Sequence, residues 1–201
     1  MTDKKNITGE PDGATPLSPE EKQGLVFKHV TTRGQLDELE QINIQEGIKW
    51  LKRQKNIDPL SEGFVCDLHK QLFGKVWSWA GSFRKAEKNI GCDPVFIAVK
   101  LRQLFDDTRY WCENGTYPPL EIAARFHHLL VQIHLFPNGN GRHARIMASA
   151  VLTMVLKENP IDWSGGQDLQ SMSGKRKEYI EALRAADGHD YKPLLKYVGE
   201  I

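Results

Sequence analysis

Cysteine is scarce in this chain, and the cysteines present are poorly placed for cross-linking or metal binding. The 201 residues include three cysteines. Cys66, Cys92 and Cys112 are widely spaced, odd in number and form no Cys-x-x-Cys pair. This pattern argues against a disulfide framework and against a zinc site of the cysteine type. A reducing compartment fits it best.

Long hydrophobic runs are missing as well. No stretch is apolar enough to span a membrane, and the first residues contain no hydrophobic segment of the kind found in signal peptides. We therefore expect a soluble, cytoplasmic protein that has no membrane partner.

The chain also lacks an excess of charge of either sign. Its 27 basic and 26 acidic residues give a formal net charge of +1. Because no basic excess is available to bind a polyanion, direct nucleic-acid binding is not expected. The length suits one domain with a sizeable core.

Apolar residues recur at helical spacing over most of the chain, which predicts a mostly α fold. Ser18 and Pro19 are typical of an N-cap and a first helical position, and they lie at the end of a flexible arm predicted at residues 1–20. Residues 82–97 break the helical period and contain Gly91 and Pro94, which indicates a hairpin or loop. The other helices are predicted at 36–51, 61–73, 97–113, 119–134, 141–157, 173–186 and 190–198.

The most informative stretch reads Ile-His-Leu-Phe-Pro-Asn-Gly-Asn-Gly-Arg-His-Ala-Arg. Gly139 and Gly141 lack a Cβ, so the loop can take positive φ and bring its N–H groups close to an anion. A helix starting near Asn140, as its N-cap, would add the positive end of its dipole. Arg142 and Arg145 lie three residues apart on that helix and suit a polyphosphate.

His134 is the last residue of the amphipathic helix predicted at 119–134. A helix C-terminus favours a protonated imidazole, whereas a general base must be neutral. We expect the cationic neighbours Arg142 and Arg145 to lower the pKa of His134. A lone Gly-x-Gly is usually a turn and a lone histidine is usually a core residue, but the combination predicts a base beside a phosphate site.

The order His-x-Phe-x-x-Gly-Asn-Gly-Arg-x-x-Arg resembles the signature of the Fic (Fido-fold) family, which has Asp or Glu before the first glycine. Among the family's branches, the chain most resembles the one called mobile mystery protein B. Residues 79–91 resemble the family's flap region, and residues 179–191 resemble its C-terminal helix and turn. The resemblance implies a mostly α, Fic-type helical bundle with a short β-hairpin flap over the active site, in a bacterial cytoplasmic protein.

The resemblance also implies a domain organisation. A flexible arm at residues 1–20 would precede an N-terminal helical region at residues 21–56, which holds a candidate inhibitory helix. The Fic core domain would occupy residues 57–201.

By this resemblance the chain is a protein adenylyltransferase. It would move AMP from ATP, with Mg²⁺, to a Ser, Thr or Tyr hydroxyl of a target protein, with self-modification or a homo-oligomer as further expectations. His134 would act as the base. The implied ATP- and phosphate-binding residues are Asn138, Gly139, Asn140, Gly141, Arg142 and Arg145.

Asn138 departs from the family's pattern. The family's carboxylate at this position binds the metal, whereas an Asn offers a neutral and therefore weaker oxygen ligand for Mg²⁺. We therefore expect lower metal affinity and low activity. The alternative is a catalytically weak nucleotide-binding regulatory module, for example in a toxin–antitoxin-like pair.

Three further assignments depend on the resemblance. Glu46 matches the glutamate of the family's inhibitory helix and would pair with Arg145, although a solvated pair with Lys49 is the ordinary alternative. Tyr179 and Tyr191 match the adenine end of the pocket, or else they pack the terminal helices. The candidate flap contacts to the target are Arg84, Lys85, Lys88 and Asn89.

Overall fold

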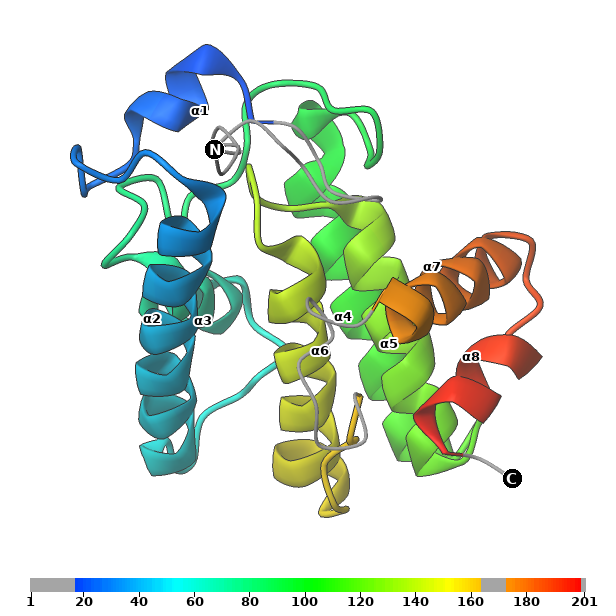
Figure 1. Ribbon diagram of the computed structural model, residues 1–201. Coiled ribbons are helices and arrows are strands. Elements are labelled where there is room, and N and C mark those ends of the chain that lie inside the picture. Colours follow the sequence, from blue (N-terminus) through cyan, green and yellow to red (C-terminus); the bar gives the residue numbers. More distant parts are fainter. Residues whose placement is uncertain (1–16, 164–172, 200–201) are drawn as a thin grey trace.

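The predicted helical architecture is confirmed in a computed structural model of the chain, which describes residues 17–163 and 173–199 (Figure 1). Most of the predicted N-terminal arm lies outside these residues. The helices are α1 (Pro19–Gln23), α2 (Arg33–Arg53), α3 (Glu62–Phe73), α4 (Ile97–Asn114), α5 (Pro119–Ile133), α6 (Asn140–Ala150), α7 (Ser173–Asp187) and α8 (Lys192–Val198). A 3-10 turn, η1 (Pro94–Phe96), precedes α4, and a π-helical turn, η2 (Val151–Leu156), extends α6.

Side-chain caps fix the starts of the first three helices. Ser18 and Thr32 each form a capping box, with Glu21 and Gln35 respectively, and the Ser61 hydroxyl accepts from a backbone N–H of the first turn of α3. These contacts satisfy N–H groups that have no partner within the helix. The predicted Ser18 cap is therefore confirmed.

The helices pack in a way that places α3 against the start of α6. In Figure 1, α2 lies beside α3, α6 occupies the middle, and α5 packs against both α6 and α8. The His143 ring, on α6, lies 3.0 Å by Nε2 from the carbonyl oxygen of Val65 on α3. The loop before α6 is consequently held against the core.

The flap segment is an irregular loop, and the expected β-hairpin is not formed in the described residues. The β-type pairing in the described residues is an isolated bridge between Leu25 and Trp77, outside the flap segment. Carbonyl groups that a partner strand would use at Ala86 and Cys92 instead accept hydrogen bonds from the Arg84 guanidinium. A buried arginine thus takes the place of strand pairing. The mostly α fold itself is as predicted.

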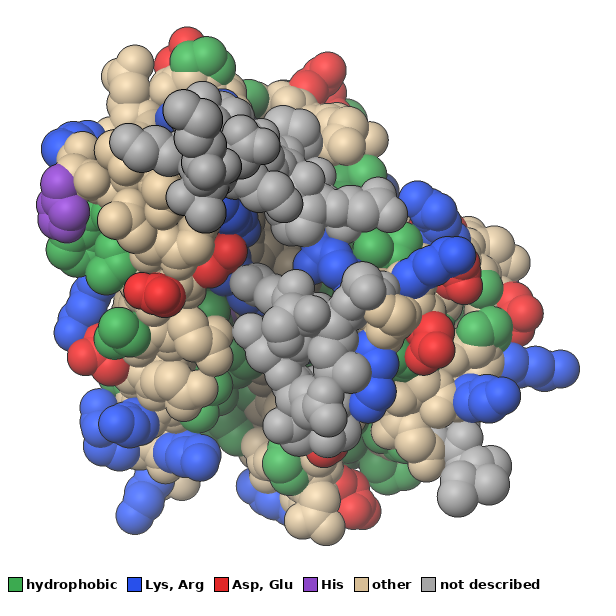
Figure 2. Space-filling model, viewed as in Figure 1, with side chains coloured by type: hydrophobic (Ala, Val, Ile, Leu, Met, Phe, Trp, Pro, Cys, Tyr) green, Lys and Arg blue, Asp and Glu red, His purple; other side chains and the backbone are tan. Residues whose placement is uncertain are grey.

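No helix in the described part of the chain has the length and apolarity needed to cross a membrane. Basic and acidic side chains are mixed over the face drawn in Figure 2, as the nearly balanced composition predicts. Basic side chains gather at the end of α2, where Lys52 and Arg53 occupy the last turn.

Candidate active site

His134 caps the C-terminus of α5 in the left-handed conformation, with φ 59°. Its N–H donates to the Leu130 carbonyl, and its own carbonyl accepts from Nε of Arg84 at 2.6 Å. Pro137 follows shortly, as is common after a helix that ends in this way. The backbone of His134 is therefore fixed from both sides while its side chain leaves the helix.

The imidazole of His134 is buried, at 4% exposure, and neither ring nitrogen has a hydrogen-bond partner among the described residues. Burial lowers the pKa of His134 to about 4, with further lowering from Arg84 and then Lys88. The sequence-based expectation of a neutral ring holds, but its cause was misassigned to Arg142 and Arg145. A neutral imidazole has one unprotonated nitrogen, which can accept a proton.

The loop from Phe136 to Asn140 is closed by the Asn140 side chain. Its Oδ1 accepts from the Phe136 N–H at 2.9 Å, and its Nδ2 donates to the Phe136 carbonyl at 2.7 Å. Gly139, with φ 80°, is the N-cap of α6, so Asn140 is the first helical residue and not the cap. A Cβ on Gly139 would lie 2.8 Å from the Phe73 ring, so both conformation and space require glycine there.

The start of α6 faces a polar group of side chains. No side chain of the described residues caps this helix end, and its first-turn N–H groups lack intrahelical partners. A Cβ built on Gly141 would lie 3.8 Å from Oη of Tyr179 and 4.0 Å from Nη1 of Arg145. The Arg145 guanidinium in turn lies 5.4 Å from the centre of the Tyr179 ring. This end of α6 fits an anion.

Arg142 has a different environment, because its guanidinium is paired with Glu40 of α2. Nη1 of Arg142 donates to Oε2 of Glu40 at 2.6 Å, and the Trp77 indole donates to the other carboxylate oxygen at 2.7 Å. The Glu40 side chain is 2% exposed and the Arg142 side chain 13%. One of the two motif arginines therefore already has a buried counter-ion.

Sequence reasoning missed Glu40, although a signal was present. Leu36, Glu40 and Ile44 follow one another at four-residue spacing on the buried side of α2. A charged residue on an apolar stripe needs a buried partner. That spacing could have identified Glu40 as the carboxylate that faces the core.

Glu46 does not contact Arg145 in this structure. Its carboxylate pairs with Lys75 at 2.7 Å, and both side chains are substantially exposed. The expected Glu46–Arg145 pair is therefore wrong, as is the ordinary alternative with Lys49, because Glu46 lies on the side of α2 nearer to Lys75.

The structure separates the four candidate flap residues into two kinds. Arg84 is 3% exposed and clamps the His134 carbonyl, so it is a structural residue and not a surface contact. Lys88 pairs with Glu21 and its side chain is 5% exposed. Lys85 and Asn89 lie at the surface and stay predicted contacts to a target.

The two candidate adenine-pocket tyrosines also differ. Tyr179 lies beside Arg145, and its hydroxyl lies 2.9 Å from Nε2 of His127. The Tyr191 hydroxyl lies 2.9 Å from Nδ1 of His128, and its ring packs under Arg125. The structure therefore brings Tyr179, but not Tyr191, to the start of α6. Tyr191 fastens α8 to α5.

The residues of the site do not fit a protein-held metal ion. Among the described residues, no group of three or more histidine, cysteine or acidic side chains is placed to bind one. The side-chain oxygen of Asn138, the expected ligand, accepts from the N–H of Gly139. A hard cation prefers several anionic oxygens, and Asn138 offers one neutral oxygen that is already engaged.

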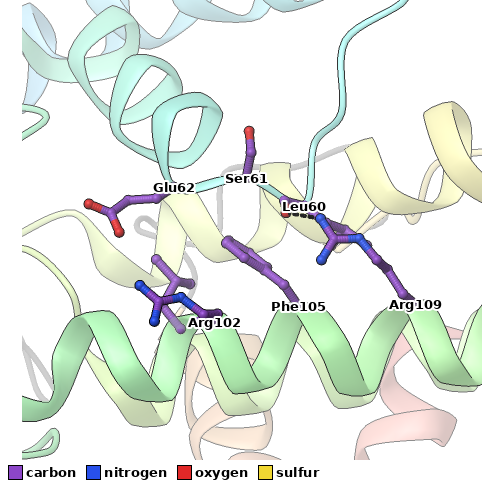
Figure 3. A pocket seen from close by; sticks show the side chains of 7 residues that line it. Leu60, Ser61, Glu62, Arg102, Phe105 and Arg109 are labelled. Atoms are coloured by element: carbon purple, nitrogen blue, oxygen red, sulfur yellow. Dashed lines mark hydrogen bonds between the residues drawn. The ribbon is translucent and has the colours of Figure 1, made fainter.

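A separate pocket of about 310 Å³ lies between the beginning of α3 and α4 (Figure 3). Arg109 extends across it to donate to the Leu60 carbonyl at 2.6 Å. No residue of the motif lines it, so it forms no part of the site around His134.

Comparison with known proteins agrees with this geometry. The Fic/DOC family profile matches residues 59–152. The protein named protein adenylyltransferase fic-1 of Caenorhabditis elegans is 26% identical over an alignment 154 residues long, which covers 73% of this chain. That match spans 28% of the relative's own length, so the chain corresponds to about a quarter of it.

Solved structures show the same fold. A fragment of Fic-1 from C. elegans superposes with a TM-score of 0.67 at 24% identity, over 88% of this chain and 51% of that one. The BepC protein of Bartonella tribocorum, with bound AMPPNP, gives a TM-score of 0.66 at 17% identity, over 90% and 96% of the two chains.

Proposed function

Because the chain carries a Fic/DOC family domain, we propose that it is a protein adenylyltransferase that moves AMP from ATP to a Ser, Thr or Tyr hydroxyl of a target protein. The relatives named protein adenylyltransferase support this reaction class. The AMPPNP bound to the structurally similar BepC protein supports an adenine nucleotide as the substrate.

One observation carries the proposal: a buried, neutral imidazole, whose two nitrogens have no hydrogen-bond partner among the described residues, lies a few residues before a helix N-terminus that no described side chain caps. A binding module has no need for a proton acceptor next to its phosphate site. Transfer of a group from a phosphate ester to a hydroxyl needs one, together with positive groups to hold the charge.

The transfer is a single displacement at the α-phosphorus of ATP. A ring nitrogen of His134 takes the hydroxyl proton of the target as the oxygen attacks this phosphorus. The new O–P bond forms as the bond between the α-phosphorus and the bridging oxygen breaks, and pyrophosphate leaves. First-turn N–H groups of α6 and the Arg145 guanidinium stabilise the charge that develops on the phosphates.

We assign Arg142 to the same phosphates, but with a restraint from α2. Its guanidinium is already partly neutralised by Glu40, so a phosphate must compete with a buried carboxylate. Glu40 thereby takes the inhibitory role that the family resemblance assigned to Glu46. Glu40→Gln keeps the size of the side chain but removes its charge, so Arg142 should bind phosphate better and transfer of AMP to the chain itself should rise. Glu46→Gln is the matched control on the same helix and should leave this self-modification unchanged.

A second function has one observation in its favour. Asn138 stands where the family has an acidic residue, so this position offers no carboxylate. Its side-chain oxygen instead accepts a hydrogen bond from the Gly139 N–H. A nucleotide-binding regulatory module, with little or no transfer activity, would be built in this way. Binding without transfer would then be the complete function of the site.

ATP labelled at the α-phosphate or at the γ-phosphate separates these functions. Incubation of the wild-type chain with each label and Mg²⁺, with and without a cell lysate as a source of targets, should put only the α-label on protein. His134→Ala should abolish transfer and keep ATP binding. The γ-label on protein would indicate phosphate transfer, and binding with neither label transferred would support the regulatory module.

A further inference from the structure

His69 connects two segments of the site that are distant in the sequence. It lies on α3 and is fully buried, at 0% exposure. Its Nε2 lies 3.1 Å from the carbonyl oxygen of Asn138, and its Nδ1 lies 3.0 Å from the backbone nitrogen of Gly81. Neither contact was expected from the sequence, where His69 is one apolar-face residue among several.

The partners of the ring fix its tautomer. A backbone N–H can only donate, so Nδ1 must accept the hydrogen bond from Gly81. The proton is then on Nε2, which donates to the Asn138 carbonyl. Burial holds the pKa of His69 well below its ordinary value, with His143 adding to the effect. Protonation would place two N–H donors against each other at Gly81.

The surroundings of the His69 ring are closely packed on both sides. Gly81 has φ 85°, and a Cβ there would lie 2.9 Å from the Cys66 carbonyl oxygen and from Lys70. On the other side, the His69 ring stacks on Phe136 with 3.7 Å between centroids. The imidazole is therefore a fixed spacer between Gly81 and the phosphate loop.

The segment that begins at Gly81 also contacts the backbone of His134, the proposed base. Three residues beyond Gly81, the Arg84 guanidinium donates to the His134 carbonyl, and the Arg84 N–H donates to the Leu135 carbonyl at 2.9 Å. The other side leads to Gly139, the cap of the anion-binding helix end. Through these two connections, His69 links the segment that holds the base to the loop that holds the phosphates.

We propose that His69 is a positioning residue, which sets the place of the His134 imidazole relative to the phosphate loop at Asn138–Gly139. The inference rests on the proposed AMP transfer. A displacement of about 1 Å between a base and a reacting phosphate can reduce a rate roughly a hundredfold, so His69 variants should affect kcat more than the KM for ATP.

Two substitutions each keep one of the two hydrogen bonds of His69 and remove the other. Relative to the imidazole, His69→Asn keeps an acceptor near Nδ1 for Gly81, whereas His69→Gln keeps a donor near Nε2 for Asn138; His69→Leu removes both. We expect kcat to fall at least about tenfold in His69→Leu, and by less in each single-link variant. The KM for ATP should change far less than kcat. Leu68→Ala, a fully buried neighbour on α3, is the control for lost stability.

The measurements are made well below each variant's unfolding temperature. A loss of kcat in His69→Leu no greater than that in Leu68→Ala would overturn the proposal, as would a change confined to the KM for ATP. Hydrogen exchange at the Gly81 amide gives an independent readout. It should stay slow in His69→Asn and become fast in His69→Gln and His69→Leu.

The exchange experiment also separates this inference from the proposed function. If the wild-type chain transfers no AMP, the proposed function fails, while the pattern of Gly81 exchange still tests the link. If transfer occurs and Gly81 exchanges equally in all three variants, the proposed function stands and the link through His69 is wrong.

Discussion

Gly139 and Gly141 stand two residues apart in one loop and face different surroundings. Gly139 is pressed against Phe73 of α3, whereas Gly141 has open space limited by Tyr179 and Arg145. We call these the inner side and the outer side of the loop. On the inner side, Asn140 is hydrogen-bonded within the protein, but on the outer side the helix end has no side-chain cap.

The difference shows how a short loop can be both rigid and open to a ligand. The inner-side polar groups have protein partners, which removes alternative conformations. We expect the outer-side groups to gain partners when an anion binds. Substitutions on the inner side should therefore reduce stability, and those on the outer side should reduce nucleotide binding.

Acid should produce the largest effect on stability, through four buried histidines. Burial lowers the pKa of His127 and of His143 to about 3 and of His134 to about 4, and that of His69 falls well below its usual value. Unfolded histidines protonate below about pH 6.5, so stability present above that pH is lost as the pH falls towards 4. Four groups give a slope of roughly 5 kcal/mol per pH unit.

Urea denaturation at several pH values measures this slope. His143→Asn removes one of the four imidazoles and should reduce the slope by about a quarter, once its own stability loss at pH 7 is subtracted. A free energy of unfolding that stayed constant between about pH 6.5 and pH 5 would contradict the buried, neutral state of these rings.

The Glu40–Arg142 pair should give the next largest effect. Glu40→Ala removes the buried carboxylate that pairs with the mostly buried Arg142 side chain and accepts from the Trp77 indole, which should cost about 3–5 kcal/mol. Glu46→Ala breaks an exposed pair and should cost less than about 1 kcal/mol. Thermal unfolding compares the two; similar losses would show that the buried pair adds little.

The two glycines themselves provide the sharpest comparison. Gly139→Ala meets Phe73 and an unfavourable φ, so it should destabilise the fold by roughly 1–3 kcal/mol. Gly141→Ala has room and lies in helix, so stability should stay equal or rise by about 0.4–1 kcal/mol. ATP affinity should fall in Gly141→Ala, because the methyl group enters the outer side. Calorimetry measures both quantities, and the reverse order of stabilities would refute the distinction.

Asn138→Asp should have the smallest effect on stability, because a carboxylate can still accept the Gly139 N–H. It adds a second, charged oxygen of the kind that Mg²⁺ prefers. We expect a change below about 0.5 kcal/mol and a higher transfer rate at limiting Mg²⁺. A rate that does not rise would mean that the nucleotide itself supplies the oxygens that matter.

Local patterns in the sequence predicted what depends on local structure. The Ser18 cap and the helices follow from neighbouring residues, and the order of His134, the glycines and the arginines predicted the candidate site. Contacts between distant segments were beyond such reasoning. Glu46 was chosen for its place in a pattern, but only the packing of α2 on α3 determines which glutamate reaches Arg142.

The flap shows the same limit. Periodicity correctly marked residues 82–97 as non-helical, but it could not show that Arg84 would be buried and take the hydrogen bonds of a missing strand. An arginine in a loop is usually exposed. Its burial is stabilised by carbonyl oxygens at the end of α5, which no local pattern reveals.

The N-terminal contacts have a consequence for where this protein can be cut. The family match begins at residue 59, yet Trp77, Lys88 and Arg142 have partners in α1 and α2. A fragment trimmed to the family boundary would lack the carboxylates that α1 and α2 supply to two cations and to an indole N–H. The unit that folds is therefore larger than the unit that the family signature marks.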